Sequence, residues 1–340
     1  MTKRTRYFMI GSVGFLTLGL TVGLAAYYGG IRGFAEPAGP EELNYVPSDA
    51  AVVAFANVRQ LMDSQFRQQV KGLESADHQK GQEELKNEIG IDIERDIDYV
   101  VACMLASPTA TSTDARSGYV LARGNFDRPR IEAFIRDKGG VEQEYRGRKM
   151  FVHAEVAATA TTGASHEMAL TFIDSKKVVA FGTPAALHRV IDLQFADAQT
   201  VRANPEVMKL IGSVEPGNNA WVVGRFDVLS KQAHLPNEVT SQLPQVTWFS
   251  AGGHVNGGLN AVVAVQARDE EAAKNLQQVV AGFIALARMQ ASAKPELNAI
   301  AQSITLSNDT SNNTVAVTFT LPLAALDALK AAKTMLQEPK

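Results

Sequence analysis

One uncharged stretch, Phe8–Tyr28, constrains this chain more than any other part of its sequence. It contains only apolar residues, glycine, serine, threonine and tyrosine. At about 1.5 Å per residue, a helix over this stretch spans the roughly 30 Å hydrocarbon core of a bilayer. The sequence therefore predicts a transmembrane helix, and this helix decides on which side of the membrane the remaining residues lie.

The charges on either side of the stretch predict its orientation. Lys3, Arg4 and Arg6 precede it, whereas the following forty residues carry more acidic than basic side chains. Basic residues are retained on the cytoplasmic side, so the amino terminus is expected inside. We expect a cytoplasmic tail (1–7), a signal anchor (8–28) and a glycine- and proline-rich tether (29–44). The protein is thus placed in the cytoplasmic (inner) membrane, with the bulk of the chain periplasmic or extracellular.

The alternative for this stretch is a cleavable signal peptide. Its apolar run is longer than a typical signal core, and Leu24-Ala25-Ala26 is a poor cleavage site, which favours an uncleaved anchor. Gly19 and Gly23 form a GxxxG pair, which allows close helix–helix contact and a homodimer. The residues expected to contact lipid or its interface are Phe8, Phe15, Leu16, Leu18, Leu20, Leu24, Tyr27 and Tyr28.

The composition of the chain limits the classes of function. Hydrophobic residues make up 46% and charged residues 20%, which is typical of a globular protein. The formal net charge is −3, so the sequence lacks the basic character of a nucleic-acid-binding protein. Its single cysteine, Cys103, excludes an internal disulfide and lies in an apolar run, where we expect it to be buried.

The exported part alternates between short apolar runs and amphipathic stretches. Asp127 and Asp269 each follow an apolar run and precede a helical pattern, as N-cap residues do. The runs expected to form strands are 51–58, 99–106, 118–126, 149–154, 168–173, 178–181, 220–226, 246–255, 259–267, 303–306 and 314–321. Helical periodicity also follows Arg59, Pro184, Asn204 and Pro322.

The two halves of this pattern match each other. Pro47 before Ala51 corresponds to Pro216 before Ala220, and the cap at Asp127 corresponds to that at Asp269. The order and the approximate spacing agree, which indicates a duplication. We therefore predict an α+β protein: two repeated α+β subdomains with largely antiparallel sheets (45–195 and 220–335), joined by a connector with a short helix (196–219).

The opening motif Tyr45-Val46-Pro47-Ser48-Asp49-Ala50, followed by this strand–helix layout, resembles uncharacterised membrane-anchored bacterial proteins with tandem α+β repeats, of the domain-of-unknown-function type. The resemblance extends over most of the exported region. It implies a cell-envelope location and supplies no catalytic residues.

The sequence contains no recognisable catalytic or cofactor motif. Its histidines have no ligand spacing, and Ser165 lacks the GxSxG context of a hydrolase nucleophile. We therefore expect no cofactor and no catalytic residue.

One candidate metal or partner site is an acidic segment. Asp92, Glu94, Asp96 and Asp98 alternate with other residues, so an extended backbone would present four carboxylates on one face. The alternative is a solvated face, or a connection whose isoleucines point inward.

Three hypotheses for function follow. The first is a non-enzymatic scaffold or interaction module that binds a protein partner in the cell envelope. The second is a carrier or sensor that holds a lipid or other apolar ligand beneath the helix 269–290, whose small residues would leave room for it. The third is a hydrolase, which a pocket joining His153 or His166 to a serine and a carboxylate would favour.

Overall fold

The structure is a computed structural model. It describes residues 39–71, 82–83, 86–105, 118–155, 166–174, 177–195, 198–228, 246–291, 295–323 and 325. The predicted cytoplasmic tail, the anchor with Gly19 and Gly23, and most of the tether lie outside these ranges. Within the described part of the chain, no helix has the length and apolarity needed to cross a bilayer.

The chain divides into two compact units. The described residues of 39–59 and 75–208 form the first unit, and those of 60–74 and 209–340 form the second. The division falls within α8 (Pro205–Val214), inside the predicted connector 196–219. The sequence did not predict that residues 60–74 belong with the second half.

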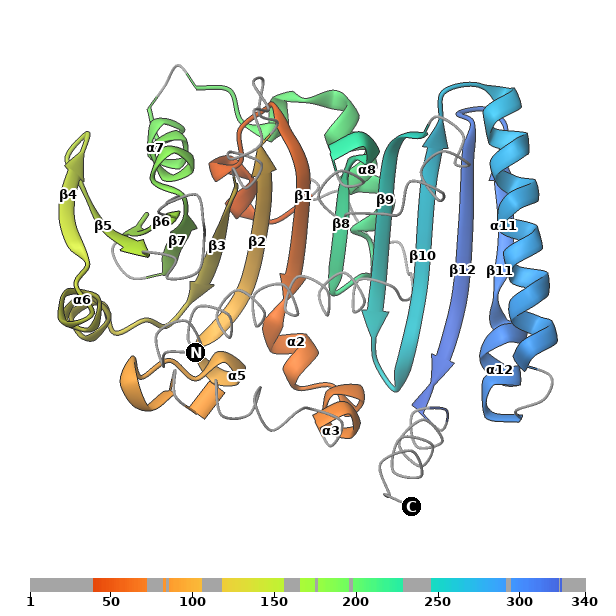
Figure 1. Cartoon of the computed structure of the whole chain (residues 1–340), viewed down its shortest axis with the longest axis horizontal. Helices are drawn as coiled ribbons and strands as arrows, with labels where there is room; N and C mark the ends of the chain where they lie inside the picture. Colours follow the sequence, from red (N-terminus) through yellow and green to blue (C-terminus); the bar gives the residue numbers. More distant parts are fainter. Residues whose placement is uncertain are drawn as a thin grey trace, which may run out of the picture. The chain divides into compact units, whose positions relative to one another are not determined.

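The first unit contains an antiparallel sheet with the strand order β1-β2-β3-β7-β6-β5-β4 (Figure 1). Its strands are β1 (Ala50–Asn57), β2 (Ile97–Leu105), β3 (Gly118–Gly124), β4 (Val141–Tyr145), β5 (Arg148–Glu155), β6 (His166–Phe172) and β7 (Val178–Gly182). Its helical segments are η1 (Glu41–Tyr45), α2 (Val58–Met62), which continues into the second unit, α5 (Ile93–Asp96), α6 (Arg128–Asp137), α7 (Pro184–Asp192) and η2 (Val201–Ala203).

The second unit contains an antiparallel sheet with the order β8-β9-β10-β12-β11. Its strands are β8 (Ala220–Arg225), β9 (Val246–Val255), β10 (Gly258–Ala267), β11 (Thr305–Asp309) and β12 (Thr314–Pro322). The helices α3 (Gln65–Lys71), α11 (Glu270–Ala291) and α12 (Pro295–Ser303) accompany it. Figure 1 shows α11 running alongside β12 and β11, and it contacts both of these strands as well as β10 and α12.

Each unit buries apolar side chains between its sheet and its helices. In the first unit, Phe126 and Ile131 contact Phe172 and Val179. In the second unit, Ala272, Ala273 and Leu276 of α11 pack with Ala267 and Val315 of the strands. These contacts explain why the apolar residues of α6 and α11 recur at helical spacing.

Two of the predicted helix starts are confirmed by capping hydrogen bonds. The carboxylate of Asp127 accepts from the backbone N–H of Arg130 at 3.2 Å, and that of Asp269 accepts from the N–H of Ala272 at 2.8 Å. Each side chain thereby satisfies an N–H group that has no partner within the helix. The α+β class with antiparallel sheets is likewise confirmed.

Two strand predictions need correction. Strand β4 was not predicted, because its residues, Val-Glu-Gln-Glu-Tyr, carry no apolar run, and all but Tyr145 are exposed. The predicted strand 303–306 begins too early: Ser303 ends α12, and β11 starts at Thr305. The alternation that indicated a strand from residue 303 therefore overlaps the last turn of a helix.

Candidate functional site

The acidic segment does not have the extended geometry on which its candidate site depended. Residues 93–96 form the helical turn α5, so that prediction was wrong. Asp92 caps this turn: its carboxylate accepts from the N–H of Glu94 at 3.2 Å and from Lys86 Nζ at 2.7 Å. Hydrogen bonding to Lys86 is the main cause of the lowered pKa of Asp92.

The other acidic candidates also have local partners. Asp96 accepts a hydrogen bond from the N–H of Asp92, and Asp98 pairs with Arg59 at 2.5 Å. Glu94 lies within α5, and the flanking Ile91 and Ile97 pack against the core. The segment is thus the helix-to-strand connection that was the alternative interpretation. In the described part of the chain, no three His, Cys, Asp or Glu side chains gather in a way that could hold a metal ion.

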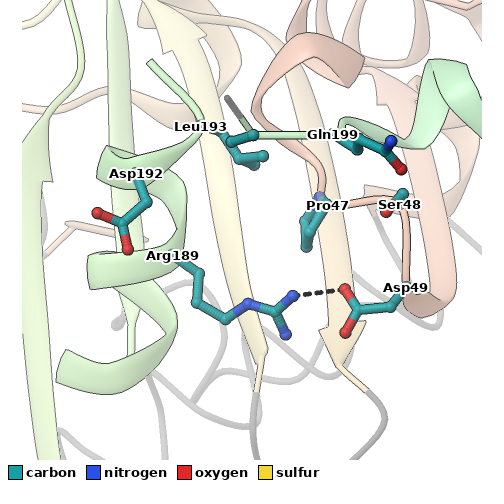
Figure 2. A pocket seen from close by; sticks show the side chains of 8 residues that line it. Pro47, Ser48, Asp49, Arg189, Asp192, Leu193 and Gln199 are labelled. Atoms are coloured by element: carbon teal, nitrogen blue, oxygen red, sulfur yellow. Dashed lines mark hydrogen bonds and ion pairs between the residues drawn. The ribbon is translucent and has the colours of Figure 1, made fainter. Parts of the chain in front are cut away.

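A polar pocket lies where the loop before β1 meets the end of α7 (Figure 2). This α7 pocket has a volume of about 260 Å³. In Figure 2, the guanidinium of Arg189 points across the opening to Asp49, and the two groups pair at 2.5 Å. Its lining residues are Pro47, Ser48, Asp49, Arg189, Asp192, Leu193, Ala198 and Gln199.

Backbone hydrogen bonds fix the loop that forms one wall of the pocket. The N–H of Ser48 donates to the carbonyl of Gln199 at 3.0 Å, and the N–H of Val201 donates to the carbonyl of Val46 at 2.7 Å. The side-chain amide of Asn204 donates to the carbonyl of Ser48 at 2.8 Å. These bonds hold residues 46–48 against 199–204 in one conformation, so the pocket is preformed.

Asp192 connects the pocket to the β4–β5 hairpin. Its carboxylate accepts from the hydroxyl of Tyr145 at 3.2 Å and pairs with Arg146 at 3.0 Å. The ring of Tyr145 stacks on that of His188, with centroids 3.9 Å apart. One carboxylate of α7 therefore both lines the pocket and holds the hairpin tip beside it.

The hairpin tip adds a second, more exposed set of contacts. The guanidinium of Arg146 lies 4.9 Å from the centre of the Phe195 ring, and Arg148 donates to Gln194 at 2.6 Å. Phe195 is 45% exposed, which is high for a phenylalanine. We define the α7 site as the pocket together with Tyr145, Arg146, Arg148, His188, Gln194 and Phe195.

The backbone of the hairpin turn is unusual at Arg146. Arg146 and Gly147 both have positive φ, at 47° and 76°, as a two-residue hairpin turn with a type I′ conformation requires. Glycine or asparagine is preferred at such positions, and a bulky side chain there costs of order 1 kcal/mol or more. Arg146 therefore occupies a turn position that favours a smaller residue.

The pocket of the α7 site presents polar and charged groups that can bind a ligand or a side chain. They are the paired Arg189 and Asp49, the carboxylate of Asp192, and the side chains of Ser48 and Gln199, and His188 is not among the lining residues. Burial raises the pKa of the nearby Cys103 thiol to about 12 and raises that of Tyr119, whose hydroxyl donates to the carbonyl of Tyr45 at 2.6 Å. Both groups therefore stay protonated at neutral pH and supply no nucleophile.

The residues of the α7 site were not singled out from the sequence. Pro47, Ser48 and Asp49 belong to the motif that carried the family resemblance, but no ligand was predicted for them. The others are scattered through residues 145–199, and only the fold brings them together. The one usable signal was Arg146 immediately before Gly147, because an arginine before glycine is unusual in a tight hairpin turn.

The chain has no match among family models or curated proteins and only distant similarity to the solved structures named below. Among solved structures, crystal form III of TP0453 has a TM-score of 0.48 at 11% identity, covering 88% of this chain and 100% of that one. Crystal form I of TP0453 has a TM-score of 0.46 at 9% identity, covering 87% of this chain and 99% of that one. Similarity at this level carries no conclusion about function.

Proposed function

We propose that this protein is a single-pass, membrane-anchored interaction module of the cell envelope, without catalytic activity, which binds a protein partner through the α7 site. The anchor is the predicted helix Phe8–Tyr28, which would hold the folded part at the outer side of the inner membrane. The composition of the α7 site supports a protein partner, because tyrosine, arginine and phenylalanine are the side chains enriched at protein–protein interfaces.

The observation that carries the proposal is the conformation of Arg146. Its positive φ favours a smaller residue, yet the arginine is held over Phe195 and beside Asp192. Unfavourable backbone conformations are concentrated at functional sites, where the side chain has a use beyond folding. An arginine displayed at a hairpin tip is well suited to contact a partner's carboxylate or aromatic ring.

The size of the pocket supports a partner side chain as its occupant. Its volume of about 260 Å³ lies just below the range of roughly 300–1,000 Å³ that small-molecule sites occupy. The most strongly contributing residues of an interface tend to fill such preformed pockets. Asp49, Asp192 and Arg189 offer both acceptors and donors, which suits a polar or basic side chain.

We also propose that the two units arose by duplication. In both units, the first three strands are neighbours in the sheet, and a helix capped by an aspartate follows the third strand. The last strand of each unit, β7 or β12, then pairs with the third strand, β3 or β10. The orders β1-β2-β3-β7-β6 and β8-β9-β10-β12-β11 correspond strand by strand. The β4–β5 hairpin has no counterpart among the described residues of the second unit, so the α7 site is built on an addition to the repeat.

No observation favours the carrier hypothesis to the same degree. That hypothesis required the small residues of helix 269–290 to face the sheet and leave room for a ligand. Ala272 and Ala273 do face the sheet but pack closely against its strands, and Ala281, Gly282 and Ala285 are exposed.

The test is site-specific photo-crosslinking of the full-length protein in its own membranes. A benzophenone amino acid replaces Phe195, and a matched control replaces Val141, which is also exposed but lies at the far end of β4. We expect one discrete protein adduct from position 195 and none from position 141. Mass spectrometry then identifies the partner.

The Arg146→Asn variant separates binding from folding. Asparagine suits the turn, so its gain offsets the lost surface contacts and the stability stays within about 1 kcal/mol of the parent. Binding of the identified partner should weaken about tenfold or more. Equal adducts at both positions, or unchanged binding by Arg146→Asn, would contradict the proposed site. Release of the protein from membranes by alkaline carbonate would contradict the anchor.

A further inference from the structure

Helix α11 exposes an apolar stripe that the proposed function does not use. Val279, Phe283, Leu286 and Met289 recur at steps of four, three and three, which places them on one side of the helix. Their exposed fractions are 36%, 67%, 50% and 64%. We call these four residues the outer face of α11. The inner face, where Ala272, Ala273 and Leu276 pack against the strands, belongs to the first two turns of α11. Phe283 lies two turns beyond Leu276 on the same side of the helix, and there it is exposed.

The outer face lies in an uncharged part of the helix. No charged residue occurs between Lys274 and Arg288. Arg288 is itself directed to its own chain, because its guanidinium donates to the carbonyls of Ala301 at 3.2 Å and Ile304 at 2.7 Å. The centre of an interface is typically depleted in charge in this way. The outer face of α11 is therefore suited to bind another surface that is uncharged and apolar.

The area of the outer face suits the core of a protein interface. A phenylalanine offers about 200 Å², so four side chains at these exposures present on the order of 400 Å² of apolar surface. The largest apolar patch on a typical monomer has about this size and is often functional. Each partner of a standard interface contributes about 800 Å², roughly half of it a buried centre. The exposed Asn275 and Gln278 supply a polar rim beside the apolar centre.

We infer that the outer face of α11 binds the same face of a second copy of this chain, so that two α11 helices pack antiparallel across a two-fold axis. Every copy presents this face, and no charge or proline within it opposes self-contact. Confinement in one membrane raises the effective concentration of the copies, a step that rests on the proposed anchor. An area too small for a tight dimer in solution then suffices.

The charges at the start of α11 favour a second copy over a lipid surface. Asp269, Glu270 and Glu271 lie at its first turn, with only Arg268 and Lys274 nearby. Helices that lie on membranes carry mainly basic residues around their apolar face, because the lipid surface is negative. A helix with this acidic start is repelled by such a surface, whereas a second copy of α11 places its neutral segment against the first.

An axis between residues 284 and 285 makes the contact self-complementary. Phe283 of each copy then lies opposite Leu286 of the other. Gly282 lies beside Phe283, and a methyl group added there would meet no atom within 4 Å among the described residues outside its chain neighbours and its own stretch of helix backbone. Glycine within a helix costs roughly 1 kcal/mol relative to alanine. Close approach of a second helix accounts for this glycine, which the chain's own packing does not require.

The test measures self-association of the full-length protein in lipid nanodiscs and in mild detergent by sedimentation and native mass spectrometry. We expect a dimer for the parent. Phe283→Asp and Leu286→Asp should each weaken its association about a hundredfold. Val141→Asp is the matched control, since Val141 is 62% exposed on β4, and it should leave the dimer intact. Circular dichroism confirms that each variant is folded.

A second measurement identifies what lies against the face. Asn275→Cys, at the polar rim of the face, is labelled with a fluorophore, and the buried Cys103, with a pKa of about 12, stays unlabelled. Energy transfer between copies supports the inference. Quenching by brominated lipid instead, a monomeric parent, or a dimer that survives Phe283→Asp overturns it. If the double variant Gly19→Leu/Gly23→Leu lost the dimer while Phe283→Asp retained it, the dimer would be assigned to the anchor and the inference would be overturned. Partner capture at position 195 is independent of all these outcomes.

Discussion

Helices α6 and α11 occupy equivalent places in the two units, yet their outer faces differ completely. Each follows the third strand of its unit and is capped by an aspartate, and each buries one large side chain, Ile131 or Leu276, to 3% exposure. On α6, Glu132 pairs with Arg128 at 2.6 Å and with Arg136 at 3.2 Å. On α11, the large exposed side chains are apolar, namely Val279, Phe283, Leu286 and Met289. The charged side chains that α6 exposes suit contact with water, whereas the apolar side chains that α11 exposes are those that the proposed self-association would cover.

The largest expected effect tests whether the inner faces are equivalent. Leu276→Ala and Ile131→Ala each remove a buried side chain, and each should lower the free energy of unfolding by about 3 kcal/mol. Urea titration of the full-length protein measures this loss. Trp221 and Trp248 both lie in the second unit, so their fluorescence reports Leu276→Ala, and circular dichroism reports both variants. A loss of less than about 1 kcal/mol at either position would contradict the view that the inner faces of α6 and α11 are equivalent.

A smaller effect concerns the start of α11. Hydrogen bonding to the N–H of Ala272, with further help from Arg268, lowers the pKa of Asp269. Because the folded-state pKa lies below the unfolded value of about 3.9, this group stabilises the fold above that value. The stabilisation is lost as the pH falls through the lowered pKa.

The Asp269→Asn variant isolates this charge, because asparagine retains the cap hydrogen bond. The melting temperature of the parent should fall as the pH is lowered from about 6 to about 3, and the fall should be shallower in the variant. Parallel pH profiles for the two proteins would show that the carboxylate charge of Asp269 does not stabilise α11.

Much of the fold was predictable because it depends on local patterns. The alternation in β9 and β10 and the caps at Asp127 and Asp269 act over a few residues, and the sequence displays them directly. The polar strand β4 was missed, because its place at the sheet edge follows from the Arg146–Gly147 turn and from pairing with β5. The α7 site was missed for a related reason: Asp49, Arg189 and Asp192 meet only through long-range packing. The outer face of α11 was not predicted, since periodicity alone does not tell which apolar residues face the core and which are exposed.

The smallest expected effect tests the outer face of α6. Glu132→Gln removes the charge that joins Arg128 to Arg136 and should cost only about 1 kcal/mol, because the two guanidinium groups are 37% and 45% exposed and stay solvated although Glu132 itself is only 14% exposed. Salt at about 0.5 M should reduce this difference further, since the screening length is then only a few ångströms. The same salt should leave the α11 self-association unchanged or strengthen it, because burial of apolar surface is not screened. The two outer faces should therefore respond oppositely to one change of solvent. If salt weakened the α11 dimer as it weakens the α6 pairs, charges rather than the apolar face would hold that dimer together.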